Sequence, residues 1–224
     1  MKKSLLILSL ALFAAASCSK KDDTPQNETP GNYMSLTANE ARTYQNTDNS
    51  TGTAIVTEYT STSTNRDSTV GSRNYHVFTN SATQGSEYYA ISGNDYYNLR
   101  ALPAELGGSL AEVLYLKTNI AVGTGWDQNF NINFSGVPIT ATLHNTIVAN
   151  DLSRTVFGKT YNHVIQVKTT VSATAIPSNN LTSNIQNYYA PGYGLIESNS
   201  LIDLNYLGIT SHTDMVTLLK SSNF

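Results

Sequence analysis

The sequence predicts an all-β domain, an antiparallel curved sheet or a two-sheet sandwich or half-barrel, with one or two short helices. Thr, Ser and Asn number 28, 24 and 24, about a third of the 224 residues. Threonine, tyrosine and valine favour strands, and asparagine, serine and glycine favour turns. Charged residues make up only 13%, so the Glu-rich and Lys-rich surface of a long helical bundle is missing.

The clearest strand pair lies in the middle of the chain. Apolar and polar residues alternate strictly through Phe130–Phe134, which places three large side chains on one face of a strand. The segment 135–138 has turn composition. Ile139–His144 then alternates again, so the two segments predict a β-hairpin.

Other segments have the composition or alternation of strands. These segments are 51–64, 75–78, 87–92, 96–100, 113–117, 165–173, 188–189, 194–198 and 201–206. Helix signals are few. Thr37–Arg42 offers an N-cap threonine and one or two turns, Pro103–Glu112 is broken by two glycines, and Ser211–Lys220 fits either a helix or a last strand.

The N-terminus predicts a secretory signal peptide over residues 1–17. Lys2 and Lys3 precede Leu5–Ala16, which is apolar except for one serine and is too short to cross a bilayer comfortably. Cys18 follows, and it is the only cysteine in the chain. A sole cysteine forms no intramolecular disulfide and no cysteine-based metal site, so the usual structural uses of cysteine are excluded.

The predicted domain organisation has three parts. After the signal peptide, residues 18–32 begin with Cys18 and continue as a tether that has no large apolar residue and is punctuated by two prolines and a glycine. Residues 33–224 form a single β-rich domain, because no Pro-rich or charged linker interrupts them and 192 residues can bury a sizeable core.

Several motifs together resemble a family. Ala15-Ala16-Ser17-Cys18 resembles the lipobox of bacterial lipoproteins, in which the cysteine sulfur receives a diacylglycerol and its new amino group is acylated. The chain further resembles uncharacterised Bacteroidota lipoproteins with a secreted β-rich domain. That resemblance rests on three segments: Gly123-Thr124-Gly125-Trp126, Gly158-Lys159-Thr160-Tyr161 and Tyr188-Tyr189-Ala190-Pro191-Gly192-Tyr193-Gly194-Leu195.

The resemblance implies a location and no chemistry. It implies palmitate on Cys18 and attachment to the outer membrane by this lipid anchor, on the surface or the periplasmic face. Lys20-Lys21-Asp22-Asp23 resembles the charged segment that follows the cysteine in surface-exported lipoproteins of the Bacteroidota. Two or three acyl chains give lasting attachment without a transmembrane helix. The family brings no assigned catalytic residue.

Composition and missing motifs exclude several classes of protein. The formal charge is −3 and no Lys/Arg cluster exists to neutralise phosphates, so a nucleic-acid partner is not expected. No Gly-x-Ser-x-Gly elbow, P-loop or dinucleotide fingerprint occurs, so no enzyme activity and no cofactor are expected. The four histidines are far apart in sequence, and no metal site is expected.

Aromatic residues are the candidates for ligand contact. Trp126, Tyr188, Tyr189 and Tyr193 could form a contact surface or could pack a core and a sheet end. In the pairs Tyr88-Tyr89, Tyr96-Tyr97 and Tyr188-Tyr189, a strand directs one ring to the core and the other outward. Outward rings suit glycan or protein contact, and ordinary cross-strand pairing remains the alternative.

Three functions remain open. The first is a lipid-anchored, non-enzymatic binding module for an apolar ligand, a glycan or an envelope protein. The second is a structural or envelope-assembly lipoprotein without a small ligand. The third is a hydrolase whose two carboxylates are far apart in sequence and meet only in the fold.

Overall fold

The computed structural model describes residues 31–101, 110–134 and 137–224, and every regular element in these ranges is a β-strand. All strand pairs are antiparallel and belong to one sheet. The strands are β1 (Ala41–Asp48), β2 (Ile55–Val70), β3 (Arg73–Asn80), β4 (Ser86–Ser92), β5 (Asp95–Ala101), β6 (Leu110–Lys117), β7 (Gly125–Phe134), β8 (Val137–Val156), β9 (Lys159–Ala173), β10 (Leu181–Ala190), β11 (Gly194–Tyr206) and β12 (Ile209–Ser222).

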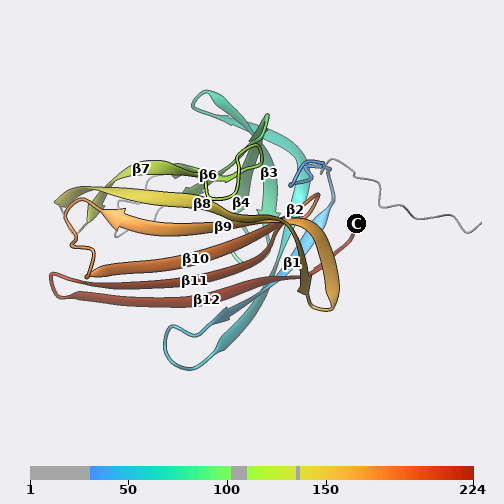
Figure 1. The fold of residues 1–224 in the computed structure, drawn as a ribbon. Coiled ribbons are helices and arrows are strands. Elements are labelled where there is room, and N and C mark those ends of the chain that lie inside the picture. Colours follow the sequence, from blue (N-terminus) through green and yellow to red (C-terminus); the bar gives the residue numbers. More distant parts are fainter. Residues whose placement is uncertain (1–30, 102–109, 135–136) are drawn as a thin grey trace, which may run out of the picture.

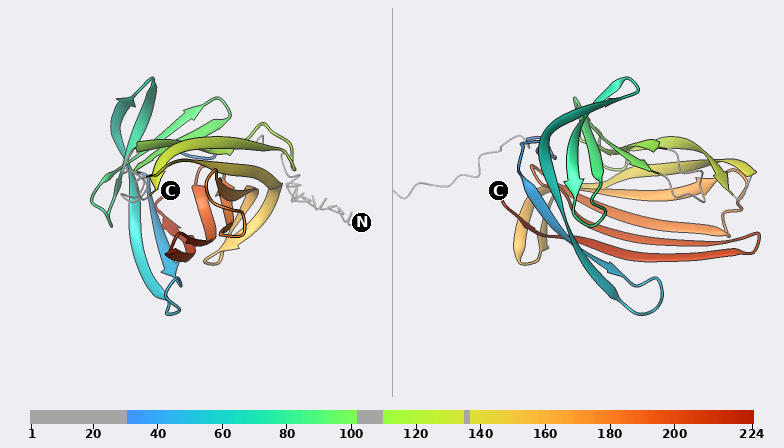
Figure 2. Two further views of the ribbon diagram at one scale, coloured as in Figure 1. Left: turned by 90° about the vertical axis from the view of Figure 1, so that its left-hand side faces the viewer. Right: turned by 180° about the vertical axis from the view of Figure 1, so that it is seen from behind.

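The sheet follows the chain order with one long-range closure. Its spatial order is β6-β5-β4-β3-β2-β1-β12-β11-β10-β9-β8-β7, so the first strand pairs with the last and β6 and β7 are the edges. The sheet curves round until these two edges approach each other (Figures 1 and 2). The predicted all-β class is therefore confirmed, with a single curved sheet in place of two packed sheets.

The short helix expected at Thr37–Arg42 is wrong, and at Ser211–Lys220 the strand alternative is confirmed. Thr37–Arg42 leads into β1, and Ser211–Lys220 lies within β12. In β12, Met215 is opposite Ser200 of β11 and Asp48 of β1, so pairing on both sides satisfies the backbone. Residues 102–109, most of the third helix candidate, lie outside the described part, and its last residues belong to β6.

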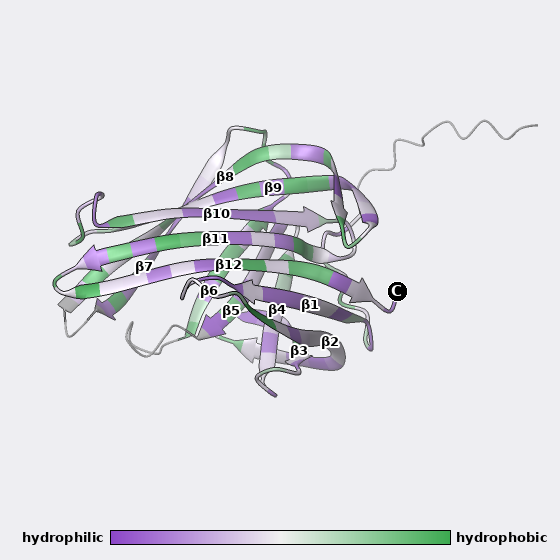
Figure 3. Ribbon diagram, turned by 90° about the horizontal axis from the view of Figure 1, so that it is seen from below, coloured by the Kyte–Doolittle hydropathy of each residue, from purple (hydrophilic) through white to green (hydrophobic). Residues whose placement is uncertain are grey.

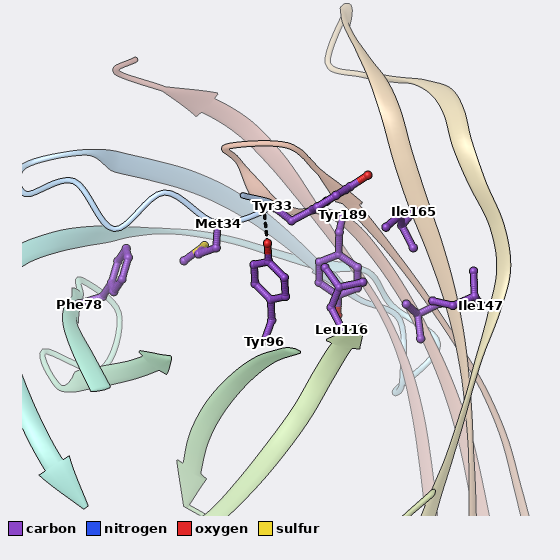
Figure 4. Close-up of a cluster of buried hydrophobic side chains, with 9 residues drawn as sticks. Tyr33, Met34, Phe78, Tyr96, Leu116, Ile147, Ile165 and Tyr189 are labelled. Atoms are coloured by element: carbon purple, nitrogen blue, oxygen red, sulfur yellow. Dashed lines mark hydrogen bonds between the residues drawn. The ribbon is translucent and has the colours of Figure 1, made fainter. Parts of the chain in front are cut away.

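The inner face of the sheet carries the main core. One cluster joins Tyr33 and Met34, ahead of the first strand, to inward residues of six strands: Phe78, Tyr96, Leu116, Ile147, Ile165, Val167 and Tyr189 (Figure 4). Hydrophobic and hydrophilic stretches both occur along β11 and β12 (Figure 3), and exposed and half-buried residues alternate from Leu201 to Tyr206 in β11, as in a strand with one wet face. No helix in the described ranges is long and apolar enough to span a membrane.

The segment before β1 is held inside one end of the curved sheet. Tyr33 N donates to the Tyr96 hydroxyl at 2.9 Å, and the Tyr33 hydroxyl donates to the His163 carbonyl at 2.6 Å. Met34 forms an isolated bridge with Tyr193 of the β10–β11 turn. These contacts tie the start of the domain to both halves of the sheet.

The two edge strands are joined by side chains. Trp126 Nε1 in β7 donates to the Leu114 carbonyl in β6 at 3.0 Å. Leu114 N in turn donates to Gln128 Oε1 at 2.8 Å. One tryptophan and one glutamine thus complete backbone hydrogen bonding at Leu114, where a further strand would otherwise be needed.

The β8–β9 hairpin bends away from the long axis of its strands (Figure 1). Its register shifts three times between Ile147 and Arg154, and Asp151 and His163 have φ values of 58° and 55°. Bulges of this kind bend a strand and increase its twist. The bent end packs against β10, β11 and β12 in a second cluster that includes Val156, Tyr161, Val164, Tyr188, Ile196 and Leu219.

Candidate functional site

A cavity of about 380 Å³ lies on the inner side of the sheet. This volume falls within the range of about 300 to 1,000 Å³ that is usual for small-molecule sites. Six tyrosines, three aliphatic residues, five neutral polar residues and two charged residues line it: Tyr44, Tyr59, Tyr88, Tyr89, Tyr115, Tyr189; Met34, Leu99, Leu195; Ser61, Asn80, Thr83, Ser86, Asn98; Glu87 and Arg100. Thr83, Ser86 and Arg100 are exposed and form the rim, whereas Tyr44, Asn98 and Tyr189 are buried and form the floor.

Strand register places the first pair of rings. Tyr44 in β1 and Tyr59 in β2 are direct cross-strand partners, and their rings stack with centroids 5.2 Å apart. The Tyr44 hydroxyl donates to the Leu195 carbonyl at 3.0 Å. This bond fixes the stacked pair against β11, on the other side of the β1–β12 junction.

A β-bulge places the central ring. In the β5–β6 pairing, Tyr96 is opposite Leu116 and Tyr97 is opposite Leu114, so Tyr115 is the extra residue. An extra residue breaks strict alternation, and here Tyr115 and Leu116 both pack against the inner cluster. Tyr115 thereby lies 6.3 Å from the Tyr89 ring and 5.4 Å from the Tyr189 ring, joining the two halves of the sheet across the hollow.

Four of the lining tyrosines present unused hydroxyl groups. Within the described residues, the hydroxyls of Tyr59, Tyr89, Tyr115 and Tyr189 form no hydrogen bond to protein, and none of them is a fully enclosed atom without a partner. They are therefore available to a molecule inside the cavity. Burial, with the nearby Glu87 charge adding to it and Arg100 opposing it, raises the pKa of Tyr59 to about 12. Burial likewise raises the pKa of Tyr89, Tyr115 and Tyr189, so all four are neutral donors at physiological pH.

Two opposite charges complete the lining. Glu87 accepts from Ser61 Oγ at 2.6 Å and from Asn80 Nδ2 at 2.8 Å. Arg100 donates through Nε and NH2 to the Asn98 amide oxygen, each at 2.9 Å, in the amide orientation that satisfies both groups. Glu87 is the one carboxylate among the described lining residues.

The predicted contact aromatics separate in the fold, and only Tyr189 lines the cavity. Trp126 is half-buried at the β6–β7 junction, packed against the inner cluster. Tyr188 is buried under the β8–β9 hairpin, with the Arg154 guanidinium 4.2 Å from its ring centre. The Tyr193 hydroxyl accepts from Lys159 Nζ at 2.9 Å, and its ring stacks on Phe224 at 5.2 Å. The remaining candidate, Cys18, lies outside the described residues.

All four histidines pair with an aspartate through Nδ1. The partners and distances are His76–Asp67 2.8 Å, His144–Asp127 3.0 Å, His163–Asp151 2.6 Å and His212–Asp203 2.6 Å. In the part of the chain that the structure describes, no three His, Cys, Asp or Glu side chains gather as metal ligands. The four pairs therefore act as local hydrogen bonds, each between neighbouring strands.

Two of these pairs continue to a serine, in the order used by serine hydrolases. His76 Nε2 lies 2.9 Å from Ser63 Oγ, and His144 Nε2 lies 2.8 Å from Ser172 Oγ. A nucleophilic serine must give its proton to the histidine. The Ser63 hydroxyl instead donates to the Leu36 carbonyl at 3.1 Å and is 1% exposed. Ser172 and His144 lie on an exposed strand face, and neither serine lines the cavity.

The fold is one curved antiparallel sheet wrapped around a tyrosine-lined, partly polar hollow. No protein-family model matches the chain, and no curated protein matches it either. A solved structure of a candidate lipoprotein from Parabacteroides distasonis is similar over 87% of this chain and 99% of its own, with 12% identity and a TM-score of 0.51. A candidate exported protein with a YmcC-like fold from Bacteroides fragilis is similar over 87% of this chain and all of its own, with 9% identity and a TM-score of 0.49.

Proposed function

We propose that this chain is a lipid-anchored protein of the cell envelope that binds a small amphipathic molecule in the tyrosine-lined cavity without transforming it. The cavity is the observation that carries the proposal. Aromatic walls supply contact area at low entropy cost, and a few polar groups fix orientation, which is the usual composition of a ligand site. The mixture of hydroxyls, amides and charges favours an amphipathic ligand over a purely apolar one such as an acyl chain.

The anchor belongs to the same proposal and is supported by the signal-peptide pattern and by the sole cysteine at position 18. The Parabacteroides chain of similar fold is described as a candidate lipoprotein, which agrees with this location. We expect labelled palmitate to enter the wild-type protein, and Cys18→Ala to move to the soluble fraction. Membrane fractionation of Cys18→Ala like that of wild type would contradict the anchor.

Native mass spectrometry of the mature protein in detergent tests ligand binding. A co-purified small molecule should be present in wild type and lost in Thr83→Trp, because the larger ring at the exposed rim closes the cavity. Ala82→Trp is the matched control: Ala82 is exposed next to the rim but does not line the cavity. A ligand retained in Thr83→Trp places binding elsewhere, and a wild type that carries and accepts no small molecule favours the structural or envelope-assembly function.

A further inference from the structure

Glu87 and Arg100, the two charged residues of the cavity, occupy neighbouring positions on the paired strands β4 and β5. In the β4–β5 register Tyr89 is opposite Asn98 and Tyr88 is opposite Leu99. The next position in this register sets Glu87 opposite Arg100. Side chains at opposite positions of antiparallel strands have Cβ atoms about 4.5 to 5.5 Å apart, and opposite charges there ordinarily attract each other.

Three pairs of buried or half-buried opposite charges elsewhere in the sheet form close ion pairs. Arg73 with Glu112, Lys117 with Asp95, and Arg154 with Glu197 lie within 2.5 to 3.0 Å. Among the described residues, Glu87 and Arg100 form no ion pair with each other or with another side chain. Glu87 turns toward β2 and β3, where Ser61 and Asn80 hold it, and Arg100 turns back to Asn98 on its own strand.

Both charged groups keep free hydrogen-bonding capacity. A carboxylate has about four acceptor sites, and Glu87 uses two of them in the bonds from Ser61 and Asn80. A guanidinium has five N–H donors, and Arg100 gives two of them to Asn98. A charged group that lines a cavity is stabilised when an opposite charge enters with the ligand.

We propose that the occupant is a small zwitterion, an amino acid or short peptide, whose ammonium binds Glu87 and whose carboxylate binds Arg100 while an apolar side chain lies among the tyrosine rings. This inference rests on the proposed function and names its ligand class. Different neutral side chains hold the two charged groups, so the site has two distinct ends. Ser61 and Asn80 hold Glu87 at the end that binds a cation, and Asn98 holds Arg100 at the end that binds an anion. A neutral glycan would leave both charges without a counter-charge.

Four probes test the charge requirement on wild-type mature protein by calorimetry and saturation-transfer NMR. L-phenylalanine carries both charges, phenethylamine lacks the carboxylate, 3-phenylpropionate lacks the ammonium, and methyl β-D-glucoside is a neutral sugar. A charge-assisted hydrogen bond contributes about 1.5–3 kcal/mol, so each missing charge should weaken binding about tenfold or more. These comparisons need no variant and so do not depend on how a substitution affects folding.

Two variants then assign each charge. Glu87→Gln should weaken the binding of phenylalanine and phenethylamine and leave the binding of phenylpropionate unchanged. Arg100→Gln should weaken the binding of phenylalanine and phenylpropionate and leave the binding of phenethylamine unchanged. Thermal melting of both variants checks that they fold. Equal binding of the three phenyl probes, wild-type affinities in both variants, binding of the glucoside alone, or no binding of phenylalanine overturns the inference. A native ligand blocked by Thr83→Trp would still support the proposed function in each of these cases.

Discussion

Arg42 Nε donates a hydrogen bond to the Tyr193 carbonyl oxygen at 2.8 Å, joining residues 151 positions apart. The same guanidinium donates through NH2 to the carbonyls of Gly192 at 3.0 Å and Ser35 at 3.1 Å. Phe224 lies against it, with its ring centre 4.9 Å from the guanidinium carbon. One buried arginine on β1 therefore holds the segment before the sheet, the β10–β11 turn and the C-terminus in one place.

Arg42→Met should destabilise the domain strongly. The arginine side chain is 1% exposed, and its removal leaves the carbonyl oxygens of Tyr193 and Ser35 to find other donors, while the Gly192 carbonyl keeps only its bond from the Ser35 amide. A buried acceptor without a partner costs about 1–3 kcal/mol, so we expect a loss of about 3 kcal/mol or more in urea unfolding. Arg42→Lys should recover only part of this, because an ammonium lacks the planar fork.

Arg66→Met is the control for this experiment. Arg66 is exposed on β2, and exposed substitutions of this kind usually change stability by less than about 0.5 kcal/mol. Similar losses for Arg42→Met and Arg66→Met would mean that the buried arginine does not hold the three segments together.

Local patterns in the sequence predicted where many strands lie. The hairpin expected from the alternation in Phe130–Phe134 is present, with Ile132 opposite Ile139 across β7 and β8. At Tyr88-Tyr89 the two residues pack in different clusters, although both line the cavity and neither is exposed as the expected outward ring would be. Tyr89 packs against the inner cluster, and Tyr88 packs with Tyr75, Ala90 and Leu99 in a separate cluster.

Long-range features of the site could not be predicted in the same way. Glu87 and Arg100 follow ordinary strand alternation, and nothing local indicates that β4, β6 and β10 meet around one hollow. Tyr115 reaches the cavity through a bulge, which breaks the period-two pattern on which strand prediction depends. Ser211–Lys220 is a strand because β1 and β11 lie on either side of it, a tertiary effect that its own residues do not encode.

Gln128→Ala should open the junction of the two sheet edges. The substitution removes the acceptor of the Leu114 amide, at a cost of about 1–3 kcal/mol for a buried donor. The Leu114 amide should then exchange its hydrogen about tenfold faster or more. Asn129→Ala is the neighbouring control, because Asn129 is exposed and bonds only Thr142 Oγ1 among the described residues. Equal exchange at Leu114 in both variants would contradict this role of Gln128.

Gly125→Ala should be more damaging than Gly123→Ala. A Cβ at Gly125 would overlap the Asn145 carbonyl oxygen, a backbone atom of the paired strand. Gly123 has φ +84° and open space around it. We expect about 3 kcal/mol for the overlap and about 1 kcal/mol for the left-handed conformation. Fluorescence of Trp126, the only tryptophan, should change in Gly125→Ala alone, and the same change in both variants would contradict the assignment.

Stability should fall steeply between about pH 10 and pH 12. Burial is the main cause that raises the pKa of nine tyrosines in the folded protein, to about 12 for Tyr33, Tyr59 and Tyr75. In an unfolded chain, tyrosines ionise at about pH 10. Because the pKa of these tyrosines is higher in the folded protein than in the unfolded chain, their contribution to the free energy of unfolding is complete below about pH 10. This contribution is lost as the pH rises through the folded pKa values.

Phenolate absorbance and circular dichroism recorded together measure this loss. In the folded protein the buried tyrosines should ionise late and together with unfolding, while the same protein in urea should titrate smoothly near pH 10. Tyr59→Phe should make the alkaline loss of stability shallower, because one proton fewer is released on unfolding. Ionisation of the folded protein that matches the urea curve would show that these rings are solvated and would contradict the predicted alkaline loss of stability.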